Sequence, residues 1–476
     1  MKEKQLEKIK ILDSDLIEAL RKDRGIESVK ELEKASERAK MESFSNIDNI
    51  LQEKILVNIE VEKEPSSKKL FGRVAPVVER LIENLRNSEY FEKVEPVGSF
   101  RRKCPDFDEV DLAAVLKDRQ NGLDYFGNLD CVKKVLERDD RKFSILRDDG
   151  LKVNLFAVGE DNYGFSLVKL TGSDSHYSEL REVAREYELT IDIDGLWTSK
   201  DEKIPIEIEE EFYKKIGMEF VPPELRENEG EIDAAKDGNL PNLVEFSEVK
   251  GDLQVHTDFS DGENTVEEMA RKGAKNGLEY LLITDHAHYF KEDGKWSRDL
   301  LEKQGEEIER VNEKLDIEVI QGIEADIERN GLNIPDSWID EVEILCAGLH
   351  GDFQEFTPYI LSSFESYPVD IFVHPFDRTL PENGQICYDL EEVVEKAKKE
   401  DVAIEISAQP TRLNFDWRNV KKYREEVDYV ISTDAHSLNQ LDYHPFGVSQ
   451  ARKGWCEKSN IVNTLPIDDL LEYFRS

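Results

Sequence analysis

The stretch LQVHTDFSDG (residues 253–262) decides the fold of the C-terminal half, because in it a short apolar run ends on a histidine with an aspartate close behind. Similar runs that end on a histidine or a carboxylate follow in LLITDHAH (281–288), QGIEADI (321–327), CAGLH (346–350), IFVHPF (371–376) and ISTDAH (431–436). Such runs are typical of buried strands in a parallel sheet. Charged segments with helical spacing lie between them, such as VEEMARKGAKNG (266–277) and LEEVVEKAKKE (390–400). Strands and helices that alternate over about 200 residues predict an α/β barrel.

The ends of the predicted strands carry candidate metal ligands. The candidates are His256, Asp261, His286, Glu324, His350, His374, Asp434 and His436. A single histidine is more often an ordinary core or surface residue, and we interpret His176, His288 and His444 in that way. Five of the chain's eight histidines, however, fall in step with three carboxylates where barrel strands end. Imidazole and carboxylate together suit Zn, Mn and Fe, so this pattern predicts a metal site.

The same residues resemble the PHP (polymerase and histidinol phosphatase) domain, from about residue 250 to the C-terminus. Two further segments, EISAQPTRLNF (405–415) and the run from STDAH to SNIVNT (432–464), resemble the closing segments of this domain in bacterial and archaeal family X DNA polymerases. The resemblance implies a distorted (β/α)7 barrel that holds up to three divalent metals, Zn or Mn.

The family pattern implies a division of the ligands among three metals. The first metal would take Gln254, His256, Glu324 and Asp434; the second would take Glu324, His350 and His374; the third would take Asp261, His286 and His436. Glu324 would therefore bridge two metals.

Gln254 departs from the family pattern, which has a histidine at this position. A neutral amide oxygen is a weaker ligand than an imidazole nitrogen, so we expect a loosely held first metal. Arg378 in HPFDR and Arg412 in QPTR match basic positions of the family. They are expected to bind phosphate, because a guanidinium pairs with it through two parallel hydrogen bonds.

The N-terminal half has a second candidate site in VGSFRRKCPDFDEVDLAAVL (97–116), a Gly-Ser turn and a basic pair followed by a strand. Alternate side chains of a strand share a face, so Glu109 and Asp111 point the same way. Two carboxylates placed like this suit a two-metal phosphoryl-transfer site, although an acidic pair is also common on a solvated strand face. A second predicted strand, LKVNLFAV (151–158), carries Asn154.

This segment resembles the palm of family X DNA polymerases, which have the nucleotidyltransferase fold. The resemblance implies that Gly98, Ser99 and Arg102 hold the phosphates of an incoming nucleotide. It places Glu109, Asp111 and Asn154 at the three catalytic aspartate positions, where Mg could bind. Glu109 is longer than Asp by one methylene and Asn154 has no charge. We therefore expect polymerase activity that is weak or lost.

The first 70 residues are predicted to be helical. LDSDLIEALRKDRGIESVKELEKA (12–35) and FSNIDNILQEKIL (44–56) resemble helix-hairpin-helix motifs without their glycines, and plain helical packing is the alternative. In the second motif Asn46 and Asp48, which tolerate positive φ, stand where Gly is usual. VPPELRENEGEIDAAKDGNLPNLVEF (221–246) has the composition of a connector. We therefore expect a multidomain α/β chain: helical residues 1–70, an α+β palm and thumb over 71–222, a linker over 223–247, and a PHP domain over 248–476.

The composition limits the function further. The formal net charge is −41, and 36% of the residues are charged. No apolar run is long enough for a membrane span and no secretory signal is present, so a cytoplasmic protein without a membrane partner is expected. The five cysteines show no CxxC pairing, which argues against a disulfide framework or a zinc ribbon. DNA binding would need basic groups gathered in a groove; alternatively, the acidity is an adaptation to salt.

Taken together, the sequence predicts a family X polymerase-like DNA repair protein whose PHP domain is a metal-dependent phosphoesterase. The reaction would be 3′→5′ exonuclease or end-processing hydrolysis on gapped or 3′-ended DNA. Two alternatives stay open at this point. One is an active gap-filling polymerase that uses dNTPs, and the other is a non-catalytic scaffold for DNA ends.

Overall fold

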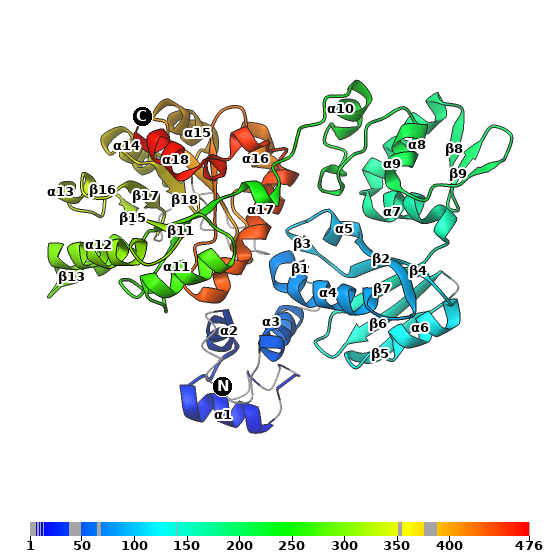
Figure 1. Cartoon of the computed structure of the whole chain (residues 1–476), viewed down its shortest axis with the longest axis horizontal. Helices are drawn as coiled ribbons and strands as arrows, with labels where there is room; N and C mark the ends of the chain where they lie inside the picture. The colour runs from blue at the N-terminus through cyan, green and yellow to red at the C-terminus, as the bar shows by residue number, and fades with distance from the viewer. Residues whose placement is uncertain are drawn as a thin grey trace. The chain divides into compact units, whose positions relative to one another are not determined.

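The computed structural model describes residues 6, 9, 11–12, 14–37, 49–63, 68–139, 141–350, 355–375 and 388–475. The chain forms two compact units (Figure 1). The first consists of Met1–Ser36 and Lys40–Leu240, and the second of Glu37–Ala39 and Pro241–Ser476. Among the described residues, no helix is long and apolar enough to cross a membrane.

The N-terminal part of the first unit is helical, with α1 (Ser14–Arg24), α2 (Val29–Glu37) and α3 (Asn49–Lys63). Leucines and isoleucines of these helices, among them Leu20, Leu32 and Ile55, form a small buried cluster. Asn46 and Asp48, the substitutes for glycine in the second hairpin motif, lie outside the described residues.

The palm is a five-stranded sheet in the order β2-β4-β7-β6-β5. Its strands are β2 (Phe91–Val97), β4 (Val110–Leu116), β5 (Val132–Arg138), β6 (Lys142–Arg147) and β7 (Lys152–Ala157). Three helices precede or connect these strands along the chain: α4 (Phe71–Arg86), α5 (Gly98–Arg101) and α6 (Arg119–Gly127). Strands β4 and β7 run parallel, with Asp111 opposite Asn154. This register places two of the expected catalytic positions side by side on neighbouring strands.

The remainder of the first unit contains the buried guanidinium of Arg226. Its elements are α7 (Tyr163–Thr171), α8 (Asp174–Glu186), β8 (Leu189–Ile191), β9 (Leu196–Thr198), β10 (Lys203–Ile204), α9 (Glu209–Lys215) and α10 (Glu231–Asp237). Arg226 pairs with Glu209 at 2.6 Å and lies over the rings of Tyr213 and Phe220. Of the residues expected to form a linker, 223–240 lie in the first unit and 241–247 in the second.

The second unit is a barrel of parallel strands surrounded by helices, which confirms the predicted fold class (Figure 1). In barrel order the strands are β11 (Gly251–Val255), β12 (Tyr280–Ile283), β15 (Glu318–Glu328), β17 (Ile344–Gly348), β18 (Ile371–Val373), β19 (Ala403–Ser407) and β20 (Tyr429–Ser432). The main helices are α11 (Val266–Lys275), α12 (Arg298–Asn312), α14 (Thr357–Ser366), α15 (Leu390–Lys399), α16 (Trp417–Tyr423), α17 (His444–Lys453) and α18 (Ile467–Arg475).

The charged segments between the strands form the expected helices, each begun by a capping side chain. The Thr265 hydroxyl and the Glu268 carboxylate form a reciprocal capping box at the start of α11. Asp389 accepts hydrogen bonds from two backbone N–H groups at the start of α15. The apolar faces of the helices pack on the strands, for example Met269 of α11 near Leu281 and Ile283 of β12.

The barrel closes between its first and last strands through side chains and one isolated backbone bridge, Val255 to Ala435, rather than a regular ladder. The Asn463 amide donates to the carbonyls of Gly251 in β11 (2.6 Å) and Ile431 in β20 (2.7 Å), and its oxygen accepts from the Ile431 N–H (2.9 Å). Nearer the carboxyl ends, the Thr433 N–H and hydroxyl donate to Asp252 at 3.1 and 2.5 Å. This closure brings the residues that follow β11 next to those that follow β20.

We predict that Asn463→Ala lowers the free energy of unfolding of the barrel by about 3 kcal/mol or more, because three buried backbone groups lose their partners. Urea denaturation measures this change. Asn276→Ala is the control, since the Asn276 amide hydrogen-bonds to Asp442 and the Leu441 carbonyl at the surface, and it should cost under about 1 kcal/mol. Equal losses in the two variants would show that Asn463 does not fasten the barrel.

Candidate metal centre and palm site

The buried carboxylate of Glu324, on β15, is the centre of the barrel site. Five side chains surround it: Gln254 Nε2 at 2.9 Å, His374 Nε2 at 2.8 Å, His256 Nε2 at 3.3 Å, His286 Nδ1 at 3.6 Å and His350 Nε2 at 3.7 Å. All five come from the carboxyl ends of strands or from the residues directly after them. The structure thus brings the expected first and second ligand sets together around one carboxylate.

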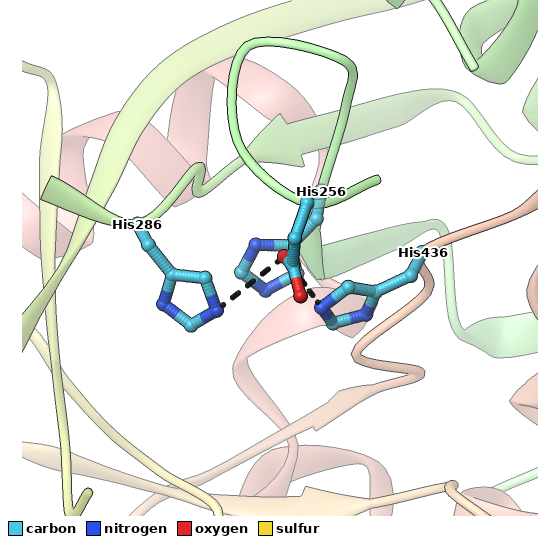
Figure 2. A group of neighbouring side chains, drawn as sticks. His256, His286 and His436 are labelled. Atoms are coloured by element: carbon cyan, nitrogen blue, oxygen red, sulfur yellow. Dashed lines mark ion pairs between the residues drawn. The ribbon is translucent and has the colours of Figure 1, made fainter. Parts of the chain in front are cut away.

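The expected third set gathers around Asp261. Its Oδ1 lies 3.1 Å from His436 Nε2 and 3.7 Å from His286 Nε2. The ring of His256 lies between these two imidazoles, with centroids 4.6 Å from His286 and 4.2 Å from His436 (Figure 2). His286 therefore faces Asp261 with one ring nitrogen and Glu324 with the other.

Asp434 connects the site to an arginine. Its Oδ1 lies 3.1 Å from His256 Nε2, and its Oδ2 accepts a hydrogen bond from Arg412 Nη1 at 3.0 Å. Arg412, expected to bind phosphate, thus lies at the edge of the ligand cluster. Arg378, the other arginine expected to bind phosphate, lies outside the described residues.

The donor set fits divalent metals. Potential ligand atoms lie within 4.8 Å of one another in three groups that overlap with the expected sets: His256, Asp261, His286 and His436; Glu324, His350 and His374; His256, Glu324 and Asp434. The second group equals the expected second set, the first adds His256 to the expected third set, and the last lacks Gln254 of the expected first set. Within the described chain, neither ring nitrogen of the buried His256 finds a hydrogen-bond partner, and neither does His286 Nδ1. Buried imidazole nitrogens that face carboxylates without hydrogen-bonding are suited to Zn or Mn.

The side-chain amide of Gln254 points its nitrogen, rather than its oxygen, at Glu324. Its amide nitrogen donates to Glu324, while its buried Oε1 has no hydrogen-bond partner among the described residues. In this arrangement the donor group of Gln254, rather than its oxygen, faces the bridging carboxylate.

Burial and the packed charges shift the pKa values of the cluster. Burial alone would raise the pKa of Glu324, but His374 and His286 hold it well below its usual value. Burial would lower the pKa of His256, but the carboxylates of Asp434 and Glu324 raise it well above its usual value. Burial lowers the pKa of His286 to about 4, so this imidazole is neutral at pH 7 and one of its two ring nitrogens can act as a ligand.

Asp326 is a site residue that the sequence analysis missed. It lies two residues after Glu324 on β15 and so on the same face of the strand. Its Oδ1 lies 2.7 Å from His350 Nδ1 and its Oδ2 3.2 Å from His288 Nδ1. The Glu-x-Asp spacing within the strand was the available signal. The contact orients the His350 ring so that its Nε2 faces Glu324.

The backbone is strained where two ligands leave their strands. His374 and Asp434 have φ values of 29° and 52°, a region that residues other than glycine rarely adopt. Gly348, at the end of β17, leaves room for the cluster. A Cβ atom there would lie 2.6 Å from Glu324 Oε1 and 2.7 Å from His374 Cε1.

The palm carboxylates are engaged by groups of the protein itself. Glu109 forms an ion pair with the Lys152 ammonium. The Asn154 amide donates to Asp111 Oδ1 at 2.7 Å, and its oxygen accepts from the Ser144 hydroxyl at 2.7 Å. Burial would raise the pKa of Glu109, but Lys152 lowers it overall. An ammonium and an amide thus lie against the two carboxylates that would bind metals in a polymerase.

The expected phosphate-binding residues of the palm follow β2, close to the start of β4 where Asp111 lies. Gly98 has a φ of 65°, and a Cβ there would lie 3.1 Å from Asp111 Oδ2. Arg102 Nη2 donates to the Ser99 hydroxyl at 3.3 Å, and its Nε donates to Glu227 at 2.9 Å. The structure therefore brings Gly98 to Asp111, and it pairs the Arg102 guanidinium with a carboxylate of the protein.

Comparison with known families and proteins agrees with this geometry. Residues 252–444 match the family described as PHP domain, and residues 166–227 match DNA polymerase beta thumb. The DNA polymerase/3′-5′ exonuclease PolX of Bacillus subtilis (strain 168) is 29% identical over 470 residues, which cover 96% of this chain and 82% of that protein.

Two further similarities are more limited. A "Probable phosphatase" of Thermoanaerobacter sp. (strain X514) is 28% identical over 205 residues, which cover 39% of this chain and 74% of that protein. The ternary gap complex of Leishmania infantum polymerase beta covers 47% of this chain and 89% of that one, with 14% identity and a TM-score of 0.30, too low to carry an argument.

We predict that Gly348→Ala displaces Glu324 and His374 and lowers the metal content by about one ion per chain after equilibration with Mn²⁺ or Zn²⁺. Inductively coupled plasma mass spectrometry measures the content. Gly305→Ala in α12 is the control, because its Cβ would meet only the end of the Gln321 side chain. Full metal content in Gly348→Ala would contradict the proposed ligand geometry.

Proposed function

Because the chain belongs to the family X DNA polymerases that carry a C-terminal PHP domain, we propose that this domain hydrolyses DNA as a metal-dependent 3′→5′ exonuclease or end-processing phosphoesterase. The observation that carries the proposal is the convergence of four imidazoles on the buried carboxylate of Glu324. The Bacillus subtilis relative supports DNA as the substrate, since its name gives it a 3′-5′ exonuclease.

The residues of the cluster have separable tasks in this proposal. When bound, Zn or Mn would polarise the phosphate and activate water for attack. Glu324 would hold two ions, with His256 and Asp434 on one side and His350 and His374 on the other. Asp261, His286 and His436 would hold the third. Arg412, fixed by Asp434, keeps further N–H groups of its guanidinium that can orient a phosphate oxygen.

Gln254 sets the expected strength of the first metal site. Its side-chain N–H donates to Glu324, so the Gln254 oxygen can become a ligand only if the side-chain amide rotates to exchange its nitrogen and oxygen. Even then the ligand is a neutral oxygen in place of an imidazole nitrogen. We infer that the first ion is held more loosely than the other two.

We predict hydrolysis of a 3′-ended DNA strand that requires added Mn²⁺ or Zn²⁺ and is lost in His286→Ala and His374→Ala. Gln254→His should tighten metal binding by roughly tenfold or more and raise the hydrolysis rate at limiting metal. A gel assay with end-labelled DNA and a metal titration measure both quantities. If Gln254→His changes neither the metal affinity nor the hydrolysis rate, the inference that the first ion is loosely held is wrong.

For the palm we propose polymerase activity that is weak or absent. Asn154 removes one carboxylate, and the Lys152 ammonium already compensates Glu109. Both differences work against a site that must hold two divalent cations, since catalytic geometry tolerates little displacement. A nucleotide would also compete with Glu227 for Arg102.

We predict template-directed extension at least about 100-fold below that of a relative with three aspartates. Glu109→Asp with Asn154→Asp should raise it, and adding Lys152→Ala should raise it further. Primer extension on a gapped duplex measures this, with His286→Ala in every variant so that hydrolysis does not remove the product. Robust processive synthesis by the chain without palm substitutions would refute the proposal and favour a gap-filling polymerase.

The remaining assignments belong to the same proposal. They are helical residues 1–70, palm and thumb over 71–222, a connector over 223–247 and the PHP domain over 248–476. The DNA would be gapped or 3′-ended, with dNTP and Mg as possible ligands of the palm, and the protein would act in the cytoplasm.

A further inference from the structure

Two aromatic rings lie exposed beside the metal centre, in the 3-10 turn η5 (Ala287–Tyr289) directly after the ligand His286. The Tyr289 residue is 43% exposed and the His288 side chain 41%. Among the described residues of the second unit, the only other large apolar residue exposed to this degree is Phe246. Single exposed apolar residues are common, so exposure alone says little.

The arrangement of the rings distinguishes this pair from an ordinary surface residue. The ring of His288 lies 5.3 Å from that of His286 with an interplanar angle of 29°. The Tyr289 ring lies 4.8 Å from His288 at 42° and 6.2 Å from His286 at 27°. The three ring centroids thus form a triangle beside a candidate metal ligand, with the His288 and Tyr289 rings tilted by 42° to one another.

Asp326 holds this arrangement in place. Its Oδ2 lies 3.2 Å from His288 Nδ1 while its Oδ1 lies 2.7 Å from His350 Nδ1. One carboxylate therefore fixes a ligand of the expected second metal and a ring of the exposed pair. A ring pair fixed to the metal centre in this way keeps a constant position relative to the reacting phosphate.

We propose that His288 and Tyr289 form a platform on which the base of the nucleotide next to the scissile phosphate stacks. The proposal rests on the proposed function of the PHP domain and deepens it, because it names a nucleobase-bearing DNA end as the substrate class. Every base has a flat π-face, so stacking on an aromatic side chain strengthens binding without selecting a sequence. A small phosphomonoester without a ring would gain nothing from the platform.

The test compares two ligands that share a sugar phosphate and differ only in the base. Calorimetry with added Mn²⁺ should show dAMP binding about 5- to 150-fold more tightly than 2-deoxyribose 5-phosphate, the gain expected for one stacked base. In Tyr289→Ala the two affinities should become nearly equal. Tyr289→Phe keeps the ring and should keep the preference for dAMP. Phe246→Ala, which removes an equally exposed ring of the same unit, should also keep it.

Equal affinities for the two ligands in the unmodified chain, or no binding of either, would overturn the platform. So would a preference for dAMP that survives Tyr289→Ala. Hydrolysis of labelled DNA is measured separately in the same preparations. If the preference is present but no DNA is hydrolysed, the proposed function fails and the platform stands. If DNA is hydrolysed without a preference for dAMP, the platform alone is wrong.

Discussion

The buried charge of Glu324 is the constraint on which the second unit depends. A carboxylate without access to water is costly unless positive or hydrogen-bonding groups surround it. Four imidazoles and one amide from the ends of other strands supply those groups. Asn463 fastens the closure between β11 and β20, which brings Asp434 within 3.1 Å of His256.

The palm meets the same electrostatic problem in another way. There, too, two carboxylates lie close together, on β4 and directly before it, but the Lys152 ammonium and the Asn154 amide compensate them. The groups around Glu324 are mostly imidazoles, which can themselves bind a metal, whereas the ammonium beside Glu109 cannot.

Much of the barrel site could be predicted from the sequence, because strand ends were marked by apolar runs and the ligands followed them directly. The partners of those residues could not. The Glu109–Lys152 contact and the Gln254 hydrogen bond to Glu324 depend on how strands pair and how side chains turn. The composition of residues 221–246 suggested a connector, yet Arg226 is buried against Glu209, Tyr213 and Phe220. The sequence shows only that Asp326 is two residues from Glu324; its role in orienting histidines follows from its contacts with His350 and His288.

We propose that the active chemistry of the chain is metal-dependent and organised by Glu324 rather than by the palm. Glu324→Gln tests it most directly, because it keeps the size of the side chain and removes its charge. Bound Mn or Zn and DNA hydrolysis are measured together, with Asp111→Asn as the matched neutralisation in the palm. The account predicts that Glu324→Gln loses both metal and hydrolysis while Asp111→Asn keeps both. Retention of metal and hydrolysis in Glu324→Gln, or their loss in Asp111→Asn, would contradict it.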